Sequence, residues 1–274
     1  MRDLPRRREL EAVVRAVAEE LGSPARETIL FENFGKHVYE LGRVVDLAGS
    51  SIMDVGGGLG VNLLCLRRLL GPGPRLVLVD RFWEYTDRNR MGPAARGIES
   101  MERAGIEVHA VDFWPAPDFP GEAGSFDVVT LLDVIEHLPG HPVPLLRRCG
   151  ELLRAGGTLL LGGPNAVALG RRVKLLRGVH PYMPYEAWTG DGYHGHFREY
   201  TPAEYADLLV RAGLRVRYRA LVAEPSATRA RSSYHNGRHG RLTPTAAALW
   251  MMWGMEAVLP GLRPSVYCAA SPGA

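Results

Sequence analysis

Residues 51–60 read SIMDVGGGLG, an apolar run that ends in Asp54-Val55 and is followed by a cluster of glycines. The apolar run has the composition of a buried strand, and residues 61–70 (VNLLCLRRLL) continue with the spacing of a helix. A tight strand-to-helix turn needs glycine, because some positions take positive φ and others must let backbone N–H groups approach a ligand. The stretch therefore predicts a ligand-binding loop at the carboxyl end of a strand.

Further apolar segments alternate with helical patterns along the chain. The other strand candidates are Arg75–Val79, Glu107–Val111, Phe126–Leu132, Gly157–Leu161, Leu214–Val222 and Ser265–Ala269. Helical spacing is found at Val61–Leu70, Gly97–Ala104 and Val143–Leu153. Strands that alternate with helices are typical of an α/β fold, in which helices cover both faces of a parallel sheet.

The chain shows no internal repeat and no second apolar core, so we expect a single domain over 1–274. Its expected parts are an N-terminal helical cap over 1–48, a core over 49–222 and 264–270, and insertions at 166–198 and 223–263. We expect the two insertions to shape the functional site.

Helix signals flank the core on both sides. Residues 5–21 carry apolar side chains at helical spacing, and Ser23-Pro24 predicts the start of a second helix. Thr201-Pro202-Ala203-Glu204 predicts a capping box, because Thr201 and Glu204 can each bond the other's backbone N–H. Gly213 is expected to end that helix.

Composition excludes several classes of protein. The chain of 274 residues is 46% hydrophobic and 23% charged, which is ordinary for a globular domain. A net charge of +3 is too small to indicate nucleic-acid binding over the whole surface. The three cysteines are far apart and fit neither a disulfide framework nor a zinc site. Without a signal-peptide pattern or a run of about 18 apolar residues, we expect a cytoplasmic protein.

The spacing of the glycines distinguishes between the known nucleotide-binding motifs. In the dinucleotide fingerprint G-x-G-x-x-G, with Gly56 and Gly58 first, the third glycine position falls on Val61. A P-loop is excluded because no Gly-Lys-Ser/Thr follows. The pattern that fits is D-x-G-x-G-x-G, with Asp54 first and Gly60 last.

With this motif, residues 50–220 resemble the class I S-adenosylmethionine-dependent methyltransferases, in the branch that acts on small molecules. The resemblance continues through LVLVD at Asp80, HAVDF at Asp112-Phe113, the segment FDVVTLLDVIEHL, and the Gly156-Gly157 turn. It implies a Rossmann-like, doubly wound, seven-stranded and mostly parallel sheet. It also implies S-adenosylmethionine as cofactor, held by Asp54, Gly56, Gly57, Gly58, Gly60, Asp80, Arg81, Asp112 and Phe113.

The chemistry of this cofactor agrees with the acidic residues. A carboxylate such as that of Asp80 offers two acceptors to the two ribose hydroxyls. A carboxylate near the sulfonium and the amino group, as expected for Asp54, offsets positive charge that would otherwise be buried unpaired. The cofactor has no diphosphate, which agrees with the departure from the dinucleotide spacing.

The run Asp133-Val134-Ile135-Glu136-His137 is the first candidate for catalysis. In the family this segment lies where the acceptor site opens, so His137 is a candidate base and Asp133 a neighbour of the methionine part or the acceptor. His137 is equally expected to cap a helix. Some relatives, including ubiquinone-biosynthesis and small-RNA O-methyltransferases, bind a divalent metal through E-x-x-E-H. Because Asp133 stands in place of the first Glu, we expect no metal.

The first insertion supplies a second set of candidates in YHGHFREYTPAEY. His196 is a second candidate base, and His194, Arg198 and Tyr200 are expected near the cleft or as ties between the insertion and the capping box. The aromatic residues Tyr182, Tyr185 and Trp188 would suit a sugar or aromatic acceptor, or form a small core of their own.

The second insertion suggests contact with a membrane or a phosphorylated acceptor. Residues 229–258 combine basic side chains with a Trp- and Met-rich segment. The alternatives are a helix packed on the sheet beside a solvated arginine loop, or a dimer contact. The basic and aromatic residues concerned are Arg229, Arg231, His235, Arg238, His239, Arg241, Trp250 and Trp253.

The sequence therefore predicts a methyltransferase that transfers the methyl group to oxygen of a small molecule, with a sugar or glycoconjugate hydroxyl as first choice. Carbon or nitrogen methylation of a lipid, quinone or polyketide intermediate is the enzymatic alternative. An NAD-binding oxidoreductase and a non-catalytic cofactor-binding partner are the alternatives from other classes. The oligomeric state is left open.

Overall fold

The computed structural model describes residues 7–21, 36–47, 49–82, 91–181, 195–223, 251 and 254–273. The predicted helix at Ser23-Pro24, the aromatic residues of the first insertion and the arginine-rich part of the second insertion lie outside these ranges. The fold that follows refers to the described residues.

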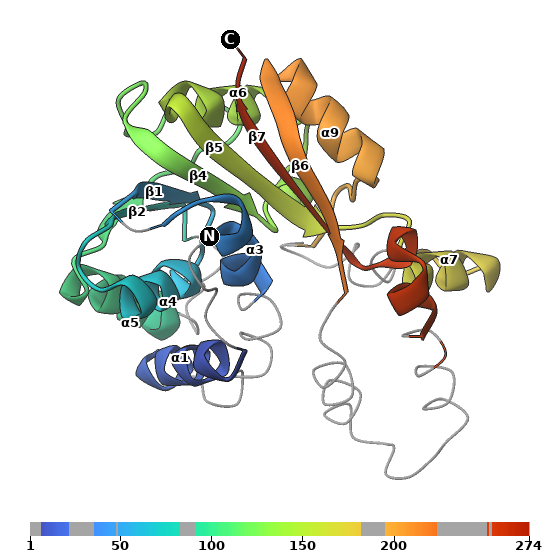
Figure 1. The fold of residues 1–274 in the computed structure, drawn as a ribbon, viewed down its shortest axis with the longest axis horizontal. Helices are drawn as coiled ribbons and strands as arrows, with labels where there is room; N and C mark the ends of the chain where they lie inside the picture. Colours follow the sequence, from blue (N-terminus) through green and yellow to red (C-terminus); the bar gives the residue numbers. More distant parts are fainter. Residues whose placement is uncertain are drawn as a thin grey trace.

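A seven-stranded sheet forms the centre of the molecule, in the order β3-β2-β1-β4-β5-β7-β6 (Figure 1). Its strands are β1 (Ser51–Val55), β2 (Arg75–Asp80), β3 (Glu107–Ala110), β4 (Phe126–Leu132), β5 (Leu153–Pro164), β6 (Leu214–Val222) and β7 (Ser265–Pro272). The first five strands pair in parallel, and β7 pairs antiparallel to both β5 and β6. The predicted Rossmann-like, mostly parallel sheet is confirmed.

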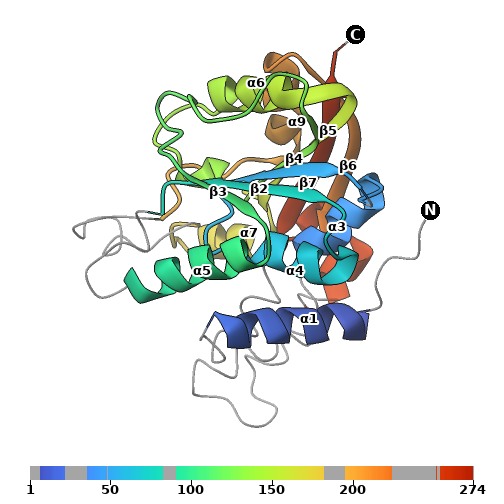
Figure 2. The ribbon, with the colours of Figure 1, turned by 90° about the vertical axis from the view of Figure 1, so that its left-hand side faces the viewer.

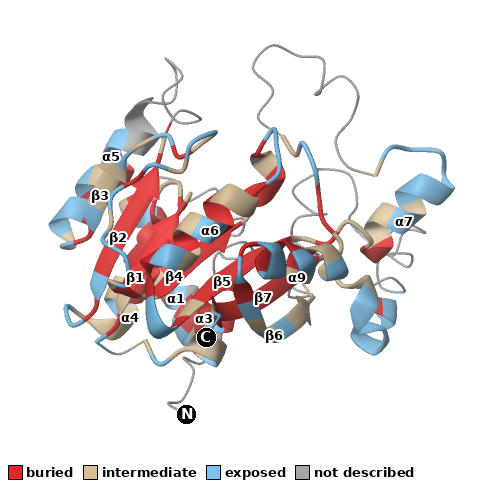
Figure 3. Ribbon diagram, turned by 90° about the horizontal axis from the view of Figure 1, so that it is seen from above, coloured by how far each residue is buried: buried red, intermediate tan, exposed pale blue. Residues whose placement is uncertain are grey.

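Helices cover both faces of the sheet, as the alternating pattern predicted (Figure 2). The helices are α1 (Arg7–Glu20), α3 (Lys36–Val44), α4 (Val61–Leu70), α5 (Met91–Arg103), α6 (Val143–Leu152), α7 (Leu169–Leu176) and α9 (Pro202–Arg211). One apolar core lies between the sheet and α6 with α9, and the other lies between the sheet and α1, α3, α4 and α5. The central strands are accordingly buried along most of their length (Figure 3).

The strand order places a ligand site. The chain moves outward from β1 to β2 and β3, and then crosses back so that β4 pairs with the other side of β1. Ligands of open α/β sheets bind outside the carboxyl ends of the strands at such a reversal. The loop after β1 and the segment after β4 therefore flank the expected crevice.

Two local expectations from the sequence are confirmed at α9. The Thr201 hydroxyl accepts from Glu204 N at 3.3 Å, and the Glu204 carboxylate accepts from Thr201 N at 2.7 Å. The helix is followed by Gly213 at φ +84°, which is a left-handed conformation that favours glycine. By contrast, α3 was not predicted as a separate helix, although it buries His37 and Glu40.

The described ends of the two insertions meet at Asn165, just beyond β5. Asn165 is fully buried; its Nδ2 donates to the Arg263 carbonyl at 2.8 Å and its N–H donates to the Pro264 carbonyl at 2.7 Å. This contact joins the start of the first insertion to the 3-10 helix η5 (Pro260–Leu262) and the start of β7. Among the described helices, none has the length and apolar character needed to cross a bilayer.

Candidate functional site

The glycine loop after β1 turns sharply at three glycines with positive φ. Gly56, Gly58 and Gly60 have φ values of +76°, +56° and +72°. The Gly56 N–H donates to the Val79 carbonyl at 2.7 Å, which fixes the loop against the end of β2. A residue with a side chain would be strained at each of these three positions.

Close packing around the loop also requires glycine, in addition to the positive φ values. A Cβ atom on Gly56 would lie 2.5 Å from a methyl group of Val134, and one on Gly57 would lie 2.5 Å from Asp54 Oδ2. A Cβ atom on Gly60 would overlap the sulfur of Met101. The loop thus lies tightly between the β1 end, α5 and the segment after β4.

Asp80, at the end of β2, lies directly beside the loop. Its Oδ2 accepts from Gly58 N at 2.8 Å, and its Oδ1 accepts from Phe82 N at 2.7 Å. Each carboxylate oxygen can accept a second hydrogen bond. The position fits the predicted role as acceptor for ribose hydroxyls, and the next residue, Arg81, is half-buried at the same strand end.

Asp112 and Phe113 follow β3 at the same edge of the sheet. The exposed Asp112 carboxylate accepts from Trp114 N at 3.0 Å, which leaves a short turn around Phe113. Phe113 is buried and packs edge-on against Phe119, with 6.4 Å between ring centroids. A Cβ atom on Gly56 would lie 3.5 Å from the Phe113 ring, so this ring borders the loop, where an adenine was predicted.

Asp54 is buried below the loop. Its Oδ1 accepts from the Thr130 hydroxyl at 2.6 Å, and its Oδ2 accepts from Asn62 Nδ2 at 3.4 Å. Burial raises the pKa of Asp54 to about 6, although the bonds from Thr130 and Asn62 lower it. Asn62 Oδ1 is buried and has no hydrogen-bond partner among the described residues.

Asp133, at the end of β4, has the opposite electrostatic environment. Its Oδ2 lies 3.2 Å from His37 Nε2 and 3.8 Å from Lys36 Nζ, both at the start of α3. Burial raises the pKa of Asp133, but the charges of Lys36 and His37 outweigh it and hold that pKa well below its ordinary value. A carboxylate with a lowered pKa is a poor proton acceptor. The low pKa of Asp133 therefore agrees better with its predicted place near the cofactor or acceptor than with a role as catalytic base.

Asp133 also adopts a left-handed conformation, with φ +52°. Its N–H donates to the Gly162 carbonyl at 2.9 Å, which ties the strained residue to β5. Non-glycine residues in this conformation are rare and are found often at functional sites. The Tyr267 hydroxyl of β7 lies 2.6 Å from His37 Nδ1, so β7 holds the imidazole that contacts Asp133.

The two candidate bases come together in space. His137 lies in the 3-10 helix η4 (Ile135–His137), and His196 lies beyond α7 in the first insertion. Their rings meet edge-on with centroids 4.8 Å apart. The contact is supported by the backbone, since the Glu136 carbonyl accepts from Phe197 N at 2.7 Å. The sequence predicted both residues, and the fold places them side by side.

The first insertion contributes a charged pair behind His196. Glu199 is buried, and its Oε1 lies 2.7 Å from His196 Nδ1. Arg171, in α7, binds the same carboxylate through Nε at 2.9 Å to Oε2 and through Nη2 to Oε1. A paired arrangement of this kind satisfies a charge that would otherwise be costly to bury.

Glu136, His137 and His196 form a group that could hold a metal ion. One donor atom from each lies within 4.8 Å of the others. Burial raises the pKa of Glu136 well above its ordinary value, with Asp133 and Glu199 adding to the shift, and Glu136 Oε2 has no hydrogen-bond partner among the described residues. Two imidazoles and a carboxylate are a donor set that suits divalent transition metals. These residues fit a metal, and the predicted absence of one stays a prediction.

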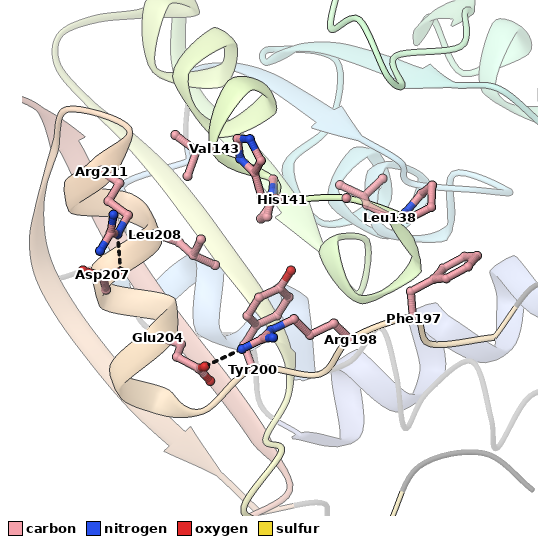
Figure 4. A pocket seen from close by; sticks show the side chains of 13 residues that line it. Leu138, His141, Val143, Phe197, Arg198, Tyr200, Glu204, Asp207, Leu208 and Arg211 are labelled. Carbon is pink, nitrogen blue, oxygen red and sulfur yellow. Dashed lines mark hydrogen bonds and ion pairs between the residues drawn. The ribbon is translucent and has the colours of Figure 1, made fainter.

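Cavities of small-molecule size adjoin this edge of the sheet. One of about 950 Å³ lies beside η4 and α9, with Leu138, Val143 and Leu208 on its walls and the ion pairs Arg198–Glu204 and Arg211–Asp207 at its rim (Figure 4).

Another, of about 810 Å³, lies between α3, the end of β6 and η5, and its wall includes Lys36, Tyr39 and Tyr218. Lys36 connects this second cavity to Asp133.

Four residues of the site were not predicted: Lys36, His37, Arg171 and Glu199. A signal for Glu199 exists in the sequence, since it follows His196 at a spacing of three residues next to the predicted capping box. For the other three, the sequence offers none, because their partners are remote along the chain.

Comparisons with known proteins agree with this geometry. Residues 6–218 match a family model described as a methyltransferase domain. The ubiquinone biosynthesis O-methyltransferase of Xanthomonas oryzae pv. oryzae (strain PXO99A) is 31% identical over 193 residues, which cover 69% of this chain and 73% of the relative. The protein of the same name from Xanthomonas euvesicatoria pv. vesicatoria (strain 85-10) is 30% identical over the same length and shares.

Solved structures share the fold at lower identity. Haemonchus contortus phosphoethanolamine N-methyltransferase 2 in complex with S-adenosyl-L-methionine has a TM-score of 0.57 at 14% identity, covering 98% of this chain and 59% of that one. A chain from the complex of the Haloferax volcanii Trm112 methyltransferase activator with its methyltransferase has a TM-score of 0.57 at 18% identity, covering 97% and 98%.

Proposed function

Because the chain belongs to the class I S-adenosylmethionine-dependent methyltransferases, we propose that it methylates a hydroxyl oxygen of a small molecule, with His196 as the proton acceptor. Family membership decides against the NAD-binding oxidoreductase considered from the sequence. The observation that carries the proposal is the contact between His196 Nδ1 and the buried Glu199 carboxylate at 2.7 Å, at the edge of the sheet where β4 and β5 end.

The residues of the site support methylation of oxygen. When bound, the cofactor supplies an electrophilic methyl group on a cationic sulfur. A hydroxyl must lose its proton as its oxygen takes the methyl group, so a base within hydrogen-bond reach accelerates the reaction. His196, whose Nδ1 contacts Glu199, would take that proton on its other ring nitrogen. Asp133 stays ionised at neutral pH through its contacts with Lys36 and His37.

The size and lining of the cavities support a small acceptor. The cavity of about 810 Å³ combines the rings of Tyr39 and Tyr218 with the cation of Lys36. Rings of this kind contact either a sugar or an aromatic ring. The acceptor is therefore tested in two classes: a sugar or glycoconjugate hydroxyl, and the hydroxyl of a quinone-related ring, which the names of the relatives favour.

The test uses labelled cofactor with both classes of acceptor and with a cell extract, followed by mass spectrometry of the product. We expect a methyl ether. Replacing His196 with Gln should lower kcat by about 10²- to 10⁴-fold, the range for loss of a general base. The affinity for the cofactor should stay unchanged, because the glycine loop is intact.

Other outcomes separate the alternatives. A product methylated on carbon or nitrogen, with full activity after replacement of both His137 and His196, would overturn the proposal in favour of the enzymatic alternative. Cofactor binding without any methylated product would support a non-catalytic partner protein.

A metal at Glu136, His137 and His196 would act as a Lewis acid on the acceptor oxygen. The buried Glu136 Oε2, which has no hydrogen-bond partner in the part of the chain that the structure describes, favours this second possibility. Titration of the metal-free protein with Mn²⁺ or Zn²⁺ by calorimetry tests it. Binding that is lost in Glu136→Gln would support the metal site, and absence of heat with either ion would exclude it.

We further propose that the insertions border the acceptor site and contact a membrane surface. Most of the predicted region 229–258 lies outside the described residues, but its described end and helix α7 carry exposed apolar side chains. Val258 is 78% exposed, and Leu176 on the basic helix α7 is 87% exposed. Figure 1 shows these two segments on the same side of the molecule. Basic and apolar side chains together suit an anionic lipid surface.

Flotation with anionic and zwitterionic vesicles tests this contact. We expect binding to anionic vesicles at low salt, weakened by Leu175→Asp with Leu176→Asp. A protein that stays unbound under those conditions would contradict it.

A further inference from the structure

Glu199 lies buried between two partners from different parts of the insertion. His196 Nδ1 contacts its Oε1 at 2.7 Å, and Arg171 binds both of its oxygens, through Nε at 2.9 Å on one side. Glu199 is 2% exposed, so the carboxylate is removed from water. Among the described residues, Arg171 and His196 are the side chains that bond its two oxygens.

The arrangement determines which nitrogen of His196 carries the proton. An ionised carboxylate only accepts hydrogen bonds, so Nδ1 must donate to Glu199. In the neutral imidazole the lone pair is then on Nε2. That nitrogen is the one that would take a proton from an acceptor or bind a metal. Without Glu199, both tautomers and other ring orientations become accessible.

Arg171 connects this pair to helix α7. Its Nη1 donates to the Pro181 carbonyl at 2.8 Å, so one guanidinium holds both the Glu199 carboxylate and the backbone beyond the helix. The helix is anchored at its first residue, Leu169, which is buried, while most of its later residues are exposed. In the described contacts, this arginine of α7 links the Glu199 carboxylate to the backbone at Pro181.

We propose that Glu199 and Arg171 are positioning residues, which fix His196 with Nδ1 protonated and Nε2 directed to the reacting oxygen. The proposal rests on the proposed function of His196 and extends it to the first insertion. Helix α7 is thus a structural part of the catalytic apparatus, although none of its residues contacts the acceptor in this scheme. Partners that hold a functional histidine in this way typically contribute 10- to 100-fold to activity or metal affinity.

The kinetic test replaces Glu199 with Gln, which keeps the shape and removes the charge. We expect kcat to fall about 10- to 100-fold, with KM for the cofactor unchanged within about twofold because the glycine loop is untouched. Arg171→Gln should lower kcat less, since Glu199 remains, and Arg171→Lys should restore part of the loss. Wild-type kcat in both Glu199→Gln and Arg171→Gln would overturn the proposal.

A matched control is available at the surface. Glu107→Gln removes the carboxylate from another arginine pair, Arg75–Glu107, in which both side chains are largely exposed and which lies at the start of β2 and β3, away from the site. We expect wild-type kcat and folding from this variant. An equal loss of kcat in Glu107→Gln would show that the effect of Glu199→Gln is a general loss of stability and would overturn the positioning role.

The tautomer itself gives a readout that does not depend on turnover. Long-range ¹H–¹⁵N spectra of the full chain, recorded above pH 8 and assigned with His196→Gln, should show His196 protonated on Nδ1. In Glu199→Gln, the population of the other tautomer should increase. Protonation of His196 on Nε2 in the wild type would overturn the proposal. Absence of any methyl ether product would overturn the proposed function alone, because the spectra would still report the His196–Glu199 contact.

Discussion

The glycine loop after β1 and the histidine cluster after β4 lie at neighbouring strand ends, but they are assembled differently. The loop consists of consecutive residues, 54–60, with Asp80 as a partner at the next strand end. The cluster combines η4 with His196, Glu199 and Arg171, which come from a separate insertion. The comparison indicates that the glycine loop, which we propose binds the cofactor, is encoded locally, whereas the histidine cluster, which we propose serves the acceptor, depends on long-range packing.

Two carboxylates show the same contrast in electrostatic terms. Asp54 is buried among neutral donors, so burial raises its pKa to about 6. For Asp133, burial is outweighed by the charges of Lys36 and His37, so its pKa is lowered. Asp54 therefore has no cationic partner among the described contacts, whereas Asp133 lies beside the cation of Lys36. The predictions that follow test these two halves.

The largest expected effect is at the loop. Gly56→Ala places a methyl group 2.5 Å from Val134 at a position with φ +76°, so the loop must open. We expect loss of detectable cofactor binding in isothermal calorimetry, together with a lower melting temperature.

Gly124→Ala is the control for Gly56→Ala. Gly124 has a similar φ of +70° but open space around a Cβ atom. This variant carries the backbone strain alone, about 1–2 kcal/mol, and should bind the cofactor normally. Cofactor affinity equal to that of the wild type in Gly56→Ala would show that the loop does not shape the cofactor site.

A smaller effect is expected from pH on cofactor affinity. Below about pH 6 Asp54 carries a proton, and the positive groups of the cofactor favour its ionised form. Binding should therefore release a proton, and affinity should rise by up to about tenfold per pH unit between pH 5 and pH 6 before levelling off. Calorimetry in buffers of different ionisation enthalpy measures the proton.

In Asp54→Asn the affinity should be weaker and independent of pH over the same range. A wild-type affinity that does not change between pH 5 and pH 7 would mean that Asp54 is remote from the positive charge of the cofactor.

Opposite effects on stability are expected from Asp54→Asn and Asp133→Asn at pH 7.5. The raised pKa of Asp54 gives a stabilising contribution that is complete below its ordinary value and is lost as the pH rises through about 6. Asp54→Asn should therefore raise the free energy of unfolding of the cofactor-free protein, by about 1–3 kcal/mol at most if a pKa of about 6 is taken. Denaturant unfolding measures it.

For Asp133 the pKa is lowered, so the expected change in the free energy of unfolding has the opposite sign. Its contribution is present above the ordinary value and is lost as the pH falls through the lowered one. Asp133→Asn should destabilise the protein at pH 7.5, because Lys36 and His37 lose their carboxylate. If the free energy of unfolding changed equally and with the same sign in both variants, the proposed difference between the environments of Asp54 and Asp133 would be contradicted.

The smallest effect is expected at the capping box of α9. Thr201→Ala removes the acceptor for Glu204 N, and loss of such a cap costs about 1 kcal/mol. The melting temperature should fall slightly while kcat stays close to that of the wild type. A large loss of kcat would show that His196 depends on the helix start as well as on Glu199.

Much of the fold could be predicted because the signals are local. Strand β1 and helix α4 have the predicted ends, and the capping box at Thr201 was read from four consecutive residues. Other ends differ. Strand β5 begins at Leu153 instead of Gly157, because pairing with Phe126 continues across a register shift, and β7 extends to Pro272 instead of Ala269. Helix α5 begins at Met91 instead of Gly97. Helix α3 was missed, since its nine residues include a glycine and its buried polar face carries His37 and Glu40.

The sequence by itself determined the class of fold and predicted the glycine loop and the two histidines, since these signals depend on spacing within short segments. Only the tertiary structure decided that His137 and His196 face one another, that Arg171 and Glu199 stand behind them, and that Lys36 and His37 contact Asp133. The physical reason is that hydrogen bonds and ion pairs act over a few ångströms in space. A linear pattern records such neighbours only when they are also close along the chain.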